Sequence, residues 1–197
     1  MLARAIPLIG HFQIRNRGTV GGSLAHGDPA ADLPSVLLAL NGSVVVRNAS
    51  GEREIAADDF FTGFLETALE PTDLLTEIRL PKAPSGSAFQ KFNRRAQDWA
   101  IVGCSVVANG DQIGIGLVNM DSRPVRAAAA EAALPAWSAI TPLQRARIMF
   151  RFKALLEANV DELALLLTSE HGKVLSDARG ELTRGIEVVE FACGIPQ

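Results

Sequence analysis

The sequence has very little cysteine and no metal-binding pattern. Only two cysteines occur among its 197 residues, Cys104 and Cys193, and they form no CxxC pair. Two separate thiols argue against a disulfide framework and indicate a reducing compartment, so we expect a cytoplasmic protein. They are also too few to hold an iron–sulfur cluster, which needs about four ligands. The three histidines are scattered without HExxH spacing, so we predict no metal site.

Strong net charge and long apolar runs are missing as well. The net charge of −3 provides no broad basic surface for nucleic acid or an anionic membrane. No apolar run approaches the length of a membrane span, and the N-terminus lacks the features of a signal peptide. We therefore predict no nucleic-acid partner and no membrane insertion. A hydrophobic content of 48% and a charged content of 21% are ordinary for a globular protein with a buried core.

Turns and short alternating segments dominate the chain before Pro135. The turn sequences NASG (48–51) and NGD (109–111) each predict a β-hairpin. Two further strands are expected in DLLTEIRL and SAFQKFNRR. Short helices are expected in DLPSVLLAL and DDFFTGFLE, and a longer one in RPVRAAAAEAAL.

The chain after Pro135 has the pattern of three helices. Thr141 and Gln144 form a capping-box pattern at the start of the first. Asn159 is the expected cap of the second helix, which Gly172 ends, and Ser176 is the expected cap of the third.

The segment GTVGGSLAHGDPAADLP (18–34) contains too much glycine to predict a helix at its start, and we expect a loop there. Successive backbone N–H groups in such a loop can cradle a pyrophosphate. The hydroxyl groups of Thr19 and Ser23 add donors, and the aspartates at positions 28 and 32 are placed to bind sugar-like hydroxyls. The alternative is a glycine-rich connection between a strand and a helix. The spacing fits neither GxGxxG nor a P-loop.

The longer string IRNRGTVGGSLAHGDPAADLP closely resembles the FAD-binding medium subunit of molybdenum hydroxylases, the family of carbon monoxide dehydrogenase and xanthine dehydrogenase flavoproteins. The resemblance continues through LETALEPTDLLTEIRLP, KFNRRAQDWAIVGCSVVA and IGIGLVNMDSRPVRAAAAEAAL, and covers roughly residues 1–134. It implies an α+β fold: a partial FAD-binding domain of the PCMH type with a mixed or antiparallel sheet over 1–81, then an antiparallel sheet with a helix over 82–134. It also implies an electron-transfer component that binds FAD and has an iron–sulfur small subunit and a molybdenum large subunit as partners.

The resemblance assigns the cofactor-binding residues position by position and assigns no catalytic side chain. The pyrophosphate would lie on Thr19, Val20, Gly21, Gly22 and Ser23, the polyol chain on Asp32, and the flavin near Leu75 and Lys91.

Each of the last three residues has a structural alternative. Asp32 would cap a helix beginning at Leu33, Leu75 would be an ordinary core residue, and Lys91 would belong to a solvated face. Arg15 and Arg17 would support the phosphate or pair with carboxylates, and we leave them outside the predicted site.

Relatives carry a further subdomain before this point, with a second glycine-rich loop (AGG) that contacts the same cofactor. The sequence begins just upstream of IRNRGT, without that loop. We therefore expect a weaker hold on FAD, because affinity falls tenfold for every ~1.4 kcal/mol of lost contact.

Residues 135–197 resemble the N-terminal helices of aldehyde dehydrogenases, of the methylmalonate-semialdehyde dehydrogenase type. The strings ELALLLTSEHGKVLSDARGEL and GIEVVEFACGIP carry the match. The nucleotide-binding turn, general base and nucleophilic cysteine of that family lie beyond these strings, and Cys193 is not that nucleophile. We therefore expect no aldehyde dehydrogenase activity and a fusion of two family segments, with self-association through the helices. The alternative function is a non-catalytic fusion remnant or helical interaction module.

Overall fold

The computed structural model describes residues 1–81, 84–95, 98–110, 112–172 and 174–194. The chain divides into two compact units, Met1–Ala132 and Ala133–Gln197. Helix α6 (Ala128–Ala139) runs across this division. The sequence-based boundaries after residues 81 and 134 stay predictions.

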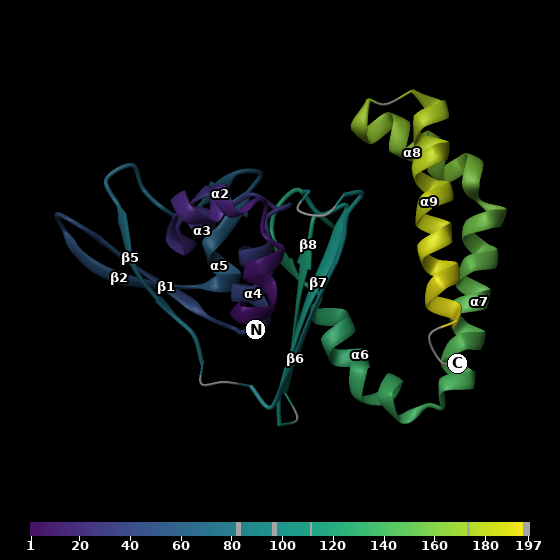
Figure 1. Cartoon of the computed structure of the whole chain (residues 1–197), viewed down its shortest axis with the longest axis horizontal. Coiled ribbons are helices and arrows are strands. Elements are labelled where there is room, and N and C mark those ends of the chain that lie inside the picture. The colour runs from purple at the N-terminus through teal and green to yellow at the C-terminus, as the bar shows by residue number, and fades with distance from the viewer. Residues whose placement is uncertain (82–83, 96–97, 111, 173, 195–197) are drawn as a thin grey trace. The chain divides into compact units, whose positions relative to one another are not determined.

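The described residues of the first unit form two larger antiparallel sheets, a two-stranded sheet and several short helices, which confirms the α+β class (Figure 1). Its helices are α1 (Leu2–Ala5), the 3-10 helix η1 (Ile6–Leu8), α2 (Phe12–Arg17), α3 (Val20–His26), α4 (Asp32–Ala39) and α5 (Ala57–Phe60). One sheet has the order β2-β1-β5, from β1 (Ser43–Asn48), β2 (Gly51–Ala56) and β5 (Leu74–Arg79). The other has the order β6-β7-β8-β9, from β6 (Gly86–Phe92), β7 (Val102–Asn109), β8 (Gln112–Val118) and β9 (Val125–Arg126). Strands β3 (Phe61–Gly63) and β4 (Glu66–Thr67) pair separately.

Both predicted hairpins are confirmed. Strands β1 and β2 pair from Ser43↔Ala56 to Asn48↔Gly51, and β7 pairs with β8 up to Asn109↔Gln112. Position 111 of the second turn lies outside the described residues. The strands expected near 73–80 and 87–95 are β5 and β6.

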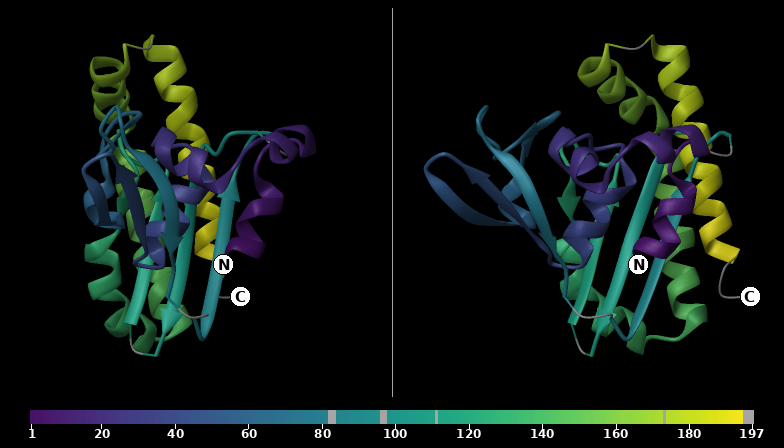
Figure 2. Two further views of the ribbon diagram at one scale, coloured as in Figure 1. Left: turned by 90° about the vertical axis from the view of Figure 1, so that its left-hand side faces the viewer. Right: turned by 60° about the vertical axis from the view of Figure 1, so that its left-hand side comes forward.

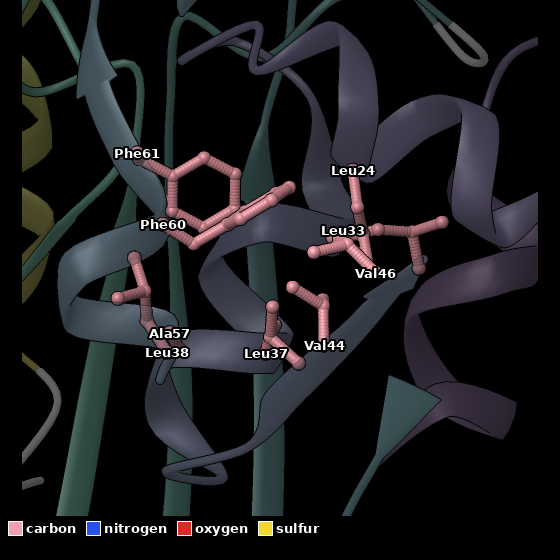
Figure 3. Packing of buried hydrophobic residues seen from close by; sticks show 9 residues of the cluster. All are labelled: Leu24, Leu33, Leu37, Leu38, Val44, Val46, Ala57, Phe60 and Phe61. Carbon is pink, nitrogen blue, oxygen red and sulfur yellow. The ribbon is translucent and has the colours of Figure 1, made fainter. Parts of the chain in front are cut away.

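Two predicted helices were wrong in part. The segment DDFFTGFLE is helical only at its start, because Phe61 begins strand β3. The rings of Phe60 and Phe61 pack edge to face in the core, with centroids 5.1 Å apart and an interplanar angle of 74° (Figure 3). The helix expected in RPVRAAAAEAAL begins only at Ala128, because Val125 and Arg126 pair with β8 as strand β9.

Helix α4 lies between the two sheets, and all eight of its residues are buried (Figures 1 and 2). Its three leucines pack in one core cluster with Val44 and Val46 of β1 (Figure 3). Its Val36 packs in a second cluster with residues of β6, β7 and β8. A helix buried on every side needs mostly apolar residues all round; the two polar residues of DLPSVLLA, Asp32 and Ser35, are buried with partners on β6 and β7.

The backbone of α4 approaches strand β8 so closely that only glycine fits opposite it. A Cβ atom on Gly114 would lie 1.9 Å from the carbonyl oxygen of Ala39, and one on Gly116 would lie 2.0 Å from that of Ser35. The hydroxyl groups of Ser35 and Ser105 share a buried hydrogen bond of 2.8 Å across the same contact. This packing fixes α4, and with it the position of Asp32 at its first turn.

The second unit is helical, with α7 (Pro142–Ala158), α8 (Val160–His171) and α9 (Leu175–Gly194) after α6. The capping box of Thr141 and Gln144 is confirmed, as is the end of α8 at Gly172, which has φ +65°. Asn159 occupies the predicted cap position of α8, but its side chain makes no cap hydrogen bond there, because its amide donates to the carbonyl of Leu155. Helix α9 begins at Leu175, so Ser176 lies within the helix and not at its cap.

Candidate functional site

A cavity of about 740 Å³ opens among the helices at the start of the first unit. Its volume falls within the range of small-molecule sites, roughly 300–1,000 Å³. The walls come from helices α2 and α3, from the segments around η1 and the start of α4, and from Lys91, Asp98 and Trp99. The lining includes Thr19, Val20, Gly22, Ser23, Asp32 and Lys91 from the predicted site.

The glycine-rich segment at the cavity is a helix, which corrects the predicted loop. Helix α3 begins at Val20, and the hydroxyl of Thr19 accepts a hydrogen bond of 2.9 Å from the backbone N–H of Gly22. Two glycines in a helix each cost about 0.5–1 kcal/mol relative to alanine. The Thr19 cap and the burial of Leu24, which is 1% exposed, offset that cost.

The five residues predicted for the pyrophosphate do not all face the cavity. Four of them line it, whereas Gly21 lies on the side of Leu75, whose Cδ2 atom would be 3.5 Å from a Cβ atom at this glycine. A Cβ atom on Gly22 would lie 2.9 Å from the Thr19 hydroxyl oxygen, so glycine keeps this wall open and the cap intact. Contact of these residues with a pyrophosphate stays a prediction.

Asp32 and Lys91 form a buried ion pair, although 59 positions separate them in sequence. The Nζ atom of Lys91 lies 2.8 Å from Oδ2 of Asp32, and the side chains are 5% and 3% exposed. The solvated-face alternative for Lys91 was therefore wrong. The helix-cap alternative for Asp32 was wrong too, because Ala31 occupies the cap position and Asp32 is the first residue of α4.

The carboxylate of Asp32 has an unused acceptor. Its Oδ1 atom is buried and has no hydrogen-bond partner among the described residues. Burial raises the pKa of Asp32 above its usual 3.8, while the hydrogen bond and charge of Lys91 act in the opposite direction. A buried oxygen without a partner is uncommon in folded proteins. Because Asp32 lines the cavity, a ligand hydroxyl there would satisfy it.

Leu75 is placed differently from the other predicted site residues. It lies on β5 opposite Val46, is partly buried, and packs against the first core cluster. It is not among the residues that line the cavity. Its contact with a flavin stays a prediction.

Sequence reasoning missed several residues of the cavity wall. Ile6, Ile9, Arg15 and Trp99 all line the cavity. Arg15 pairs with no carboxylate among the described residues, and its Nη1 atom donates to the carbonyls of Ile9 and Gly10, each at 2.6 Å. No local pattern in the sequence marks these positions, since the fold brings them together from separate segments.

The cavity suits an anionic ligand that also carries hydroxyl groups. The guanidinium of Arg15, which is always charged, lines it together with Lys91, whereas its acidic residues are Asp98 and Asp32, the ion-pair partner of Lys91. Cationic side chains around a cleft favour anions. The unused Asp32 oxygen adds an acceptor for a hydroxyl. Phosphate groups joined to a polyol chain therefore fit the residues present.

The start of the chain matches a known family. Residues 1–83 match the model described as "FAD binding domain in molybdopterin dehydrogenase". The nicotine 6-hydroxylase medium subunit of Paenarthrobacter nicotinovorans is 48% identical over 107 residues, which are 54% of this chain and 38% of that protein. This part of the chain is homologous to the FAD-binding medium subunits of molybdenum hydroxylases. The recognition made from GTVGGS and DPAADLP is thereby confirmed.

A solved medium-chain relative supports the homology. Carbon monoxide dehydrogenase from Hydrogenophaga pseudoflava aligns with a TM-score of 0.64 at 42% identity, covering 68% of this chain and 49% of that chain. The chain therefore spans about half the length of that medium chain and less of the curated relatives. The names of the relatives, as medium subunits or medium chains, make them parts of multi-subunit enzymes.

The end of the chain matches a second family. Residues 119–197 match the aldehyde dehydrogenase family model. Malonate-semialdehyde dehydrogenase from Pseudomonas aeruginosa is 54% identical over 69 residues, which are 35% of this chain and 14% of that enzyme. The second resemblance is confirmed at the level of the family.

The described residues contain neither a metal-ligand cluster nor a membrane-spanning helix. No group of three or more His, Cys, Asp or Glu side chains in the described part of the chain could hold a metal ion. None of the helices described is both long and apolar enough to cross a bilayer.

Proposed function

We propose that the first unit binds FAD in the 740 Å³ cavity and serves as an electron-transfer component of a molybdenum hydroxylase-type oxidoreductase. The observation that carries this proposal is that most residues lining the cavity lie in the segment that matches the FAD-binding family model. Thr19, Val20, Gly22, Ser23 and Asp32 line the cavity, and all five lie within the matched residues 1–83.

The protein contributes placement to this function. The first turn of α3 would lie along the phosphates, and the unused Oδ1 atom of Asp32 would accept a polyol hydroxyl. Lys91 holds the Asp32 carboxylate in place through its 2.8 Å contact. A bound flavin supplies the electron-transfer chemistry itself, so no side chain needs to act as an acid or base.

An FAD titration tests the proposal. Flavin fluorescence and the visible absorbance band would be followed for the wild type, for Gly22→Ala and for Gly185→Ala. The added methyl group at Gly22 meets the Thr19 hydroxyl at 2.9 Å, whereas a Cβ atom at Gly185 meets nothing within 4 Å. We expect saturable binding that Gly22→Ala weakens about tenfold or more, a loss of about 1.4 kcal/mol. Absence of saturable binding by the wild type would refute the proposal.

We further propose an iron–sulfur small subunit and a molybdenum large subunit as partners. The support comes from the names of relatives, which are a medium subunit and a subunit of a dehydrogenase complex. These names indicate partner subunits for the relatives without saying which ones. Coexpression with candidate small and large subunits, followed by purification through a tag on this chain, tests the assignment. Copurification in a fixed ratio supports it, and recovery of the chain alone counts against it.

For the second unit we propose self-association through its helices. Ile148, Phe152 and Leu155 recur at helical spacing on α7 and are 37%, 46% and 63% exposed. Exposed apolar side chains grouped on one helix face are typical of contact surfaces. Light scattering of the wild type and of Phe152→Glu tests this: we expect a concentration-dependent oligomer that the variant loses. A wild type that stays monomeric at high concentration would exclude self-association.

A further inference from the structure

Three consecutive backbone carbonyls of the first unit are held by cationic side chains. The segment Leu8–Gly10 ends the 3-10 helix η1 and leads toward α2. The Nζ atom of Lys91 donates to the carbonyl of Leu8 at 3.0 Å. Nη1 of Arg15 donates to the carbonyls of Ile9 and Gly10, each at 2.6 Å. Two side chains from outside the segment therefore hold carbonyls that the helices and sheets leave free.

The same segment is a wall of the cavity. Ile6, Ile9 and Gly10 line the cavity, and so does Arg15 itself. The side chains of Ile6 and Ile9 also pack against the first core cluster. Gly10 has φ +43°, a conformation that side chains other than glycine rarely adopt. The wall thus has one defined shape, and the Arg15 guanidinium is one of the contacts that fix it.

We propose that Arg15 is a positioning residue: it fixes the Ile9–Gly10 wall of the cavity, and cofactor affinity depends on this contact. The inference rests on the proposed function, because it takes FAD as the ligand. It concerns a residue outside the assigned pyrophosphate, polyol and flavin positions. Hydrogen bonds donated by a charged group are stronger than neutral ones, so two of them constrain a short turn effectively.

The chemistry of the contact favours arginine. Both bonds come from one nitrogen, Nη1. The planar guanidinium is always charged and fixes the directions of the two N–H groups on that nitrogen, whereas a lysine ammonium is a strongly hydrated point charge on a flexible stem. Within the part of the chain that the structure describes, Nε and Nη2 of Arg15 have no protein partner, so its charge is not cancelled by a carboxylate. That charge also favours an anionic ligand in the cavity it lines.

The chain offers a matched control two residues away. Arg17 lies on the same helix α2, is exposed, and makes no hydrogen bond or ion pair with the described residues. Replacement of Arg17 removes the same charge and leaves the Ile9–Gly10 contact intact. A difference between Arg15 and Arg17 variants therefore reports the contact rather than the net charge.

The test compares the wild type, Arg15→Ala, Arg15→Lys and Arg17→Ala in two measurements on the full chain. The first is the FAD dissociation constant from flavin fluorescence. We expect Arg15→Ala to weaken binding about tenfold or more, Arg15→Lys to be intermediate, and Arg17→Ala to stay within about twofold of the wild type. Added guanidinium chloride at low millimolar concentration should restore part of the Arg15→Ala affinity and leave the wild type unchanged.

The second measurement is hydrogen–deuterium exchange without FAD. Peptides that cover residues 6–15 should exchange faster in Arg15→Ala than in Arg17→Ala, while peptides from β7 and β8 stay equal and show that the unit remains folded. If Arg15→Ala unfolds the unit, Arg15→Lys replaces it in both comparisons.

The outcomes separate the two proposals. Wild-type binding with unchanged affinity in Arg15→Ala overturns the positioning role and leaves the proposed function standing. A wild type that binds no FAD overturns the proposed function and the dependence of affinity on Arg15 with it. Equal exchange of residues 6–15 in the two variants overturns the claim that Arg15 fixes the wall.

Discussion

The two units of the chain differ in what they bury. The first encloses leucine, valine and phenylalanine side chains in two core clusters. Among the described residues of the second, those that are buried are small: Ala146, Ala164, Ala178 and Cys193. Its larger apolar side chains, such as Phe150 and Phe191, are 53% and 76% exposed. Burial stabilises a fold by about 0.8 kcal/mol per CH₂ group. The stability of the first unit therefore comes mainly from its core, and that of the second depends more on local helix signals.

The largest expected effect comes from breaking the ion pair in the first unit. Lys91→Met leaves the buried Asp32 carboxylate without its cation, and removal of one partner of such a pair typically costs about 3–5 kcal/mol. Denaturant unfolding can be followed through Trp99 in a Trp137→Phe background, and through Trp137 in a Trp99→Phe background. We expect only the Trp99 signal to shift.

A double variant shows whether the pair or the lysine alone matters. Replacing both partners, with Asp32→Leu and Lys91→Met, removes the uncompensated charge and should recover most of the lost stability. A double variant as unstable as Lys91→Met would contradict the ion-pair explanation.

The next effect contrasts the same substitution in the two units. Gly116→Ala drives a Cβ atom into the Ser35 carbonyl, at 2.0 Å in the present backbone, and we expect a loss of about 1–3 kcal/mol or more. Gly185→Ala in α9 meets nothing within 4 Å and should stabilise its helix by about 0.5–1 kcal/mol. Thermal unfolding of both variants measures whether each substitution raises or lowers the melting temperature. A change in the same direction for both variants would contradict the predicted difference between the two units.

A smaller effect tests the local signals of the second unit. Thr141→Ala removes the capping box of α7 and should cost about 1 kcal/mol. Far-ultraviolet circular dichroism during a thermal melt would report the loss of helix. Ser176→Ala serves as the comparison, because Ser176 is exposed within α9 and its side chain makes no hydrogen bond with the described residues. If both variants lose the same helicity, the capping box is not what sustains α7.

The smallest effect is the pH dependence of the first unit. Burial raises the pKa of Asp32 in the folded state above 3.8. At a pH between the unfolded and the folded pKa of Asp32, the folded protein therefore binds more protons than the unfolded chain. The contribution of Asp32 to the free energy of unfolding is therefore greatest below the unfolded pKa and declines as pH rises through the folded pKa. The free-energy difference between the wild type and Asp32→Asn, measured from acidic to neutral pH, should show this decline. A difference that grows with pH would contradict the sign.

The sequence predicted most strands and helices because their signals are local. Turns such as NASG place both strands of a hairpin at once, and the Thr141 capping box marks a helix start. Helix α3 was missed because a side-chain cap and tertiary packing outweigh the low helix propensity of two glycines. Asn159 takes the predicted cap position of α8, but the sequence does not reveal that its amide donates backward to Leu155 of α7.

The site was predicted as separate residues rather than as a geometry. Asp32 and Lys91 were each assigned near the cofactor, but no local pattern links residues 59 positions apart. The wall at Ile9 and Gly10 carries no signal at all, because its role depends on a contact with Arg15 that exists only in the folded chain.

The central place of α4 has a consequence for how the first unit assembles. Because one helix supplies core residues to both sheets, neither sheet can complete its core until α4 has docked. The two sheets should therefore form and melt in a single cooperative transition. A chain cut after residue 81 would leave one side of a fully buried helix facing water, and a nascent chain would face the same exposure during synthesis until strands β6–β8 emerge.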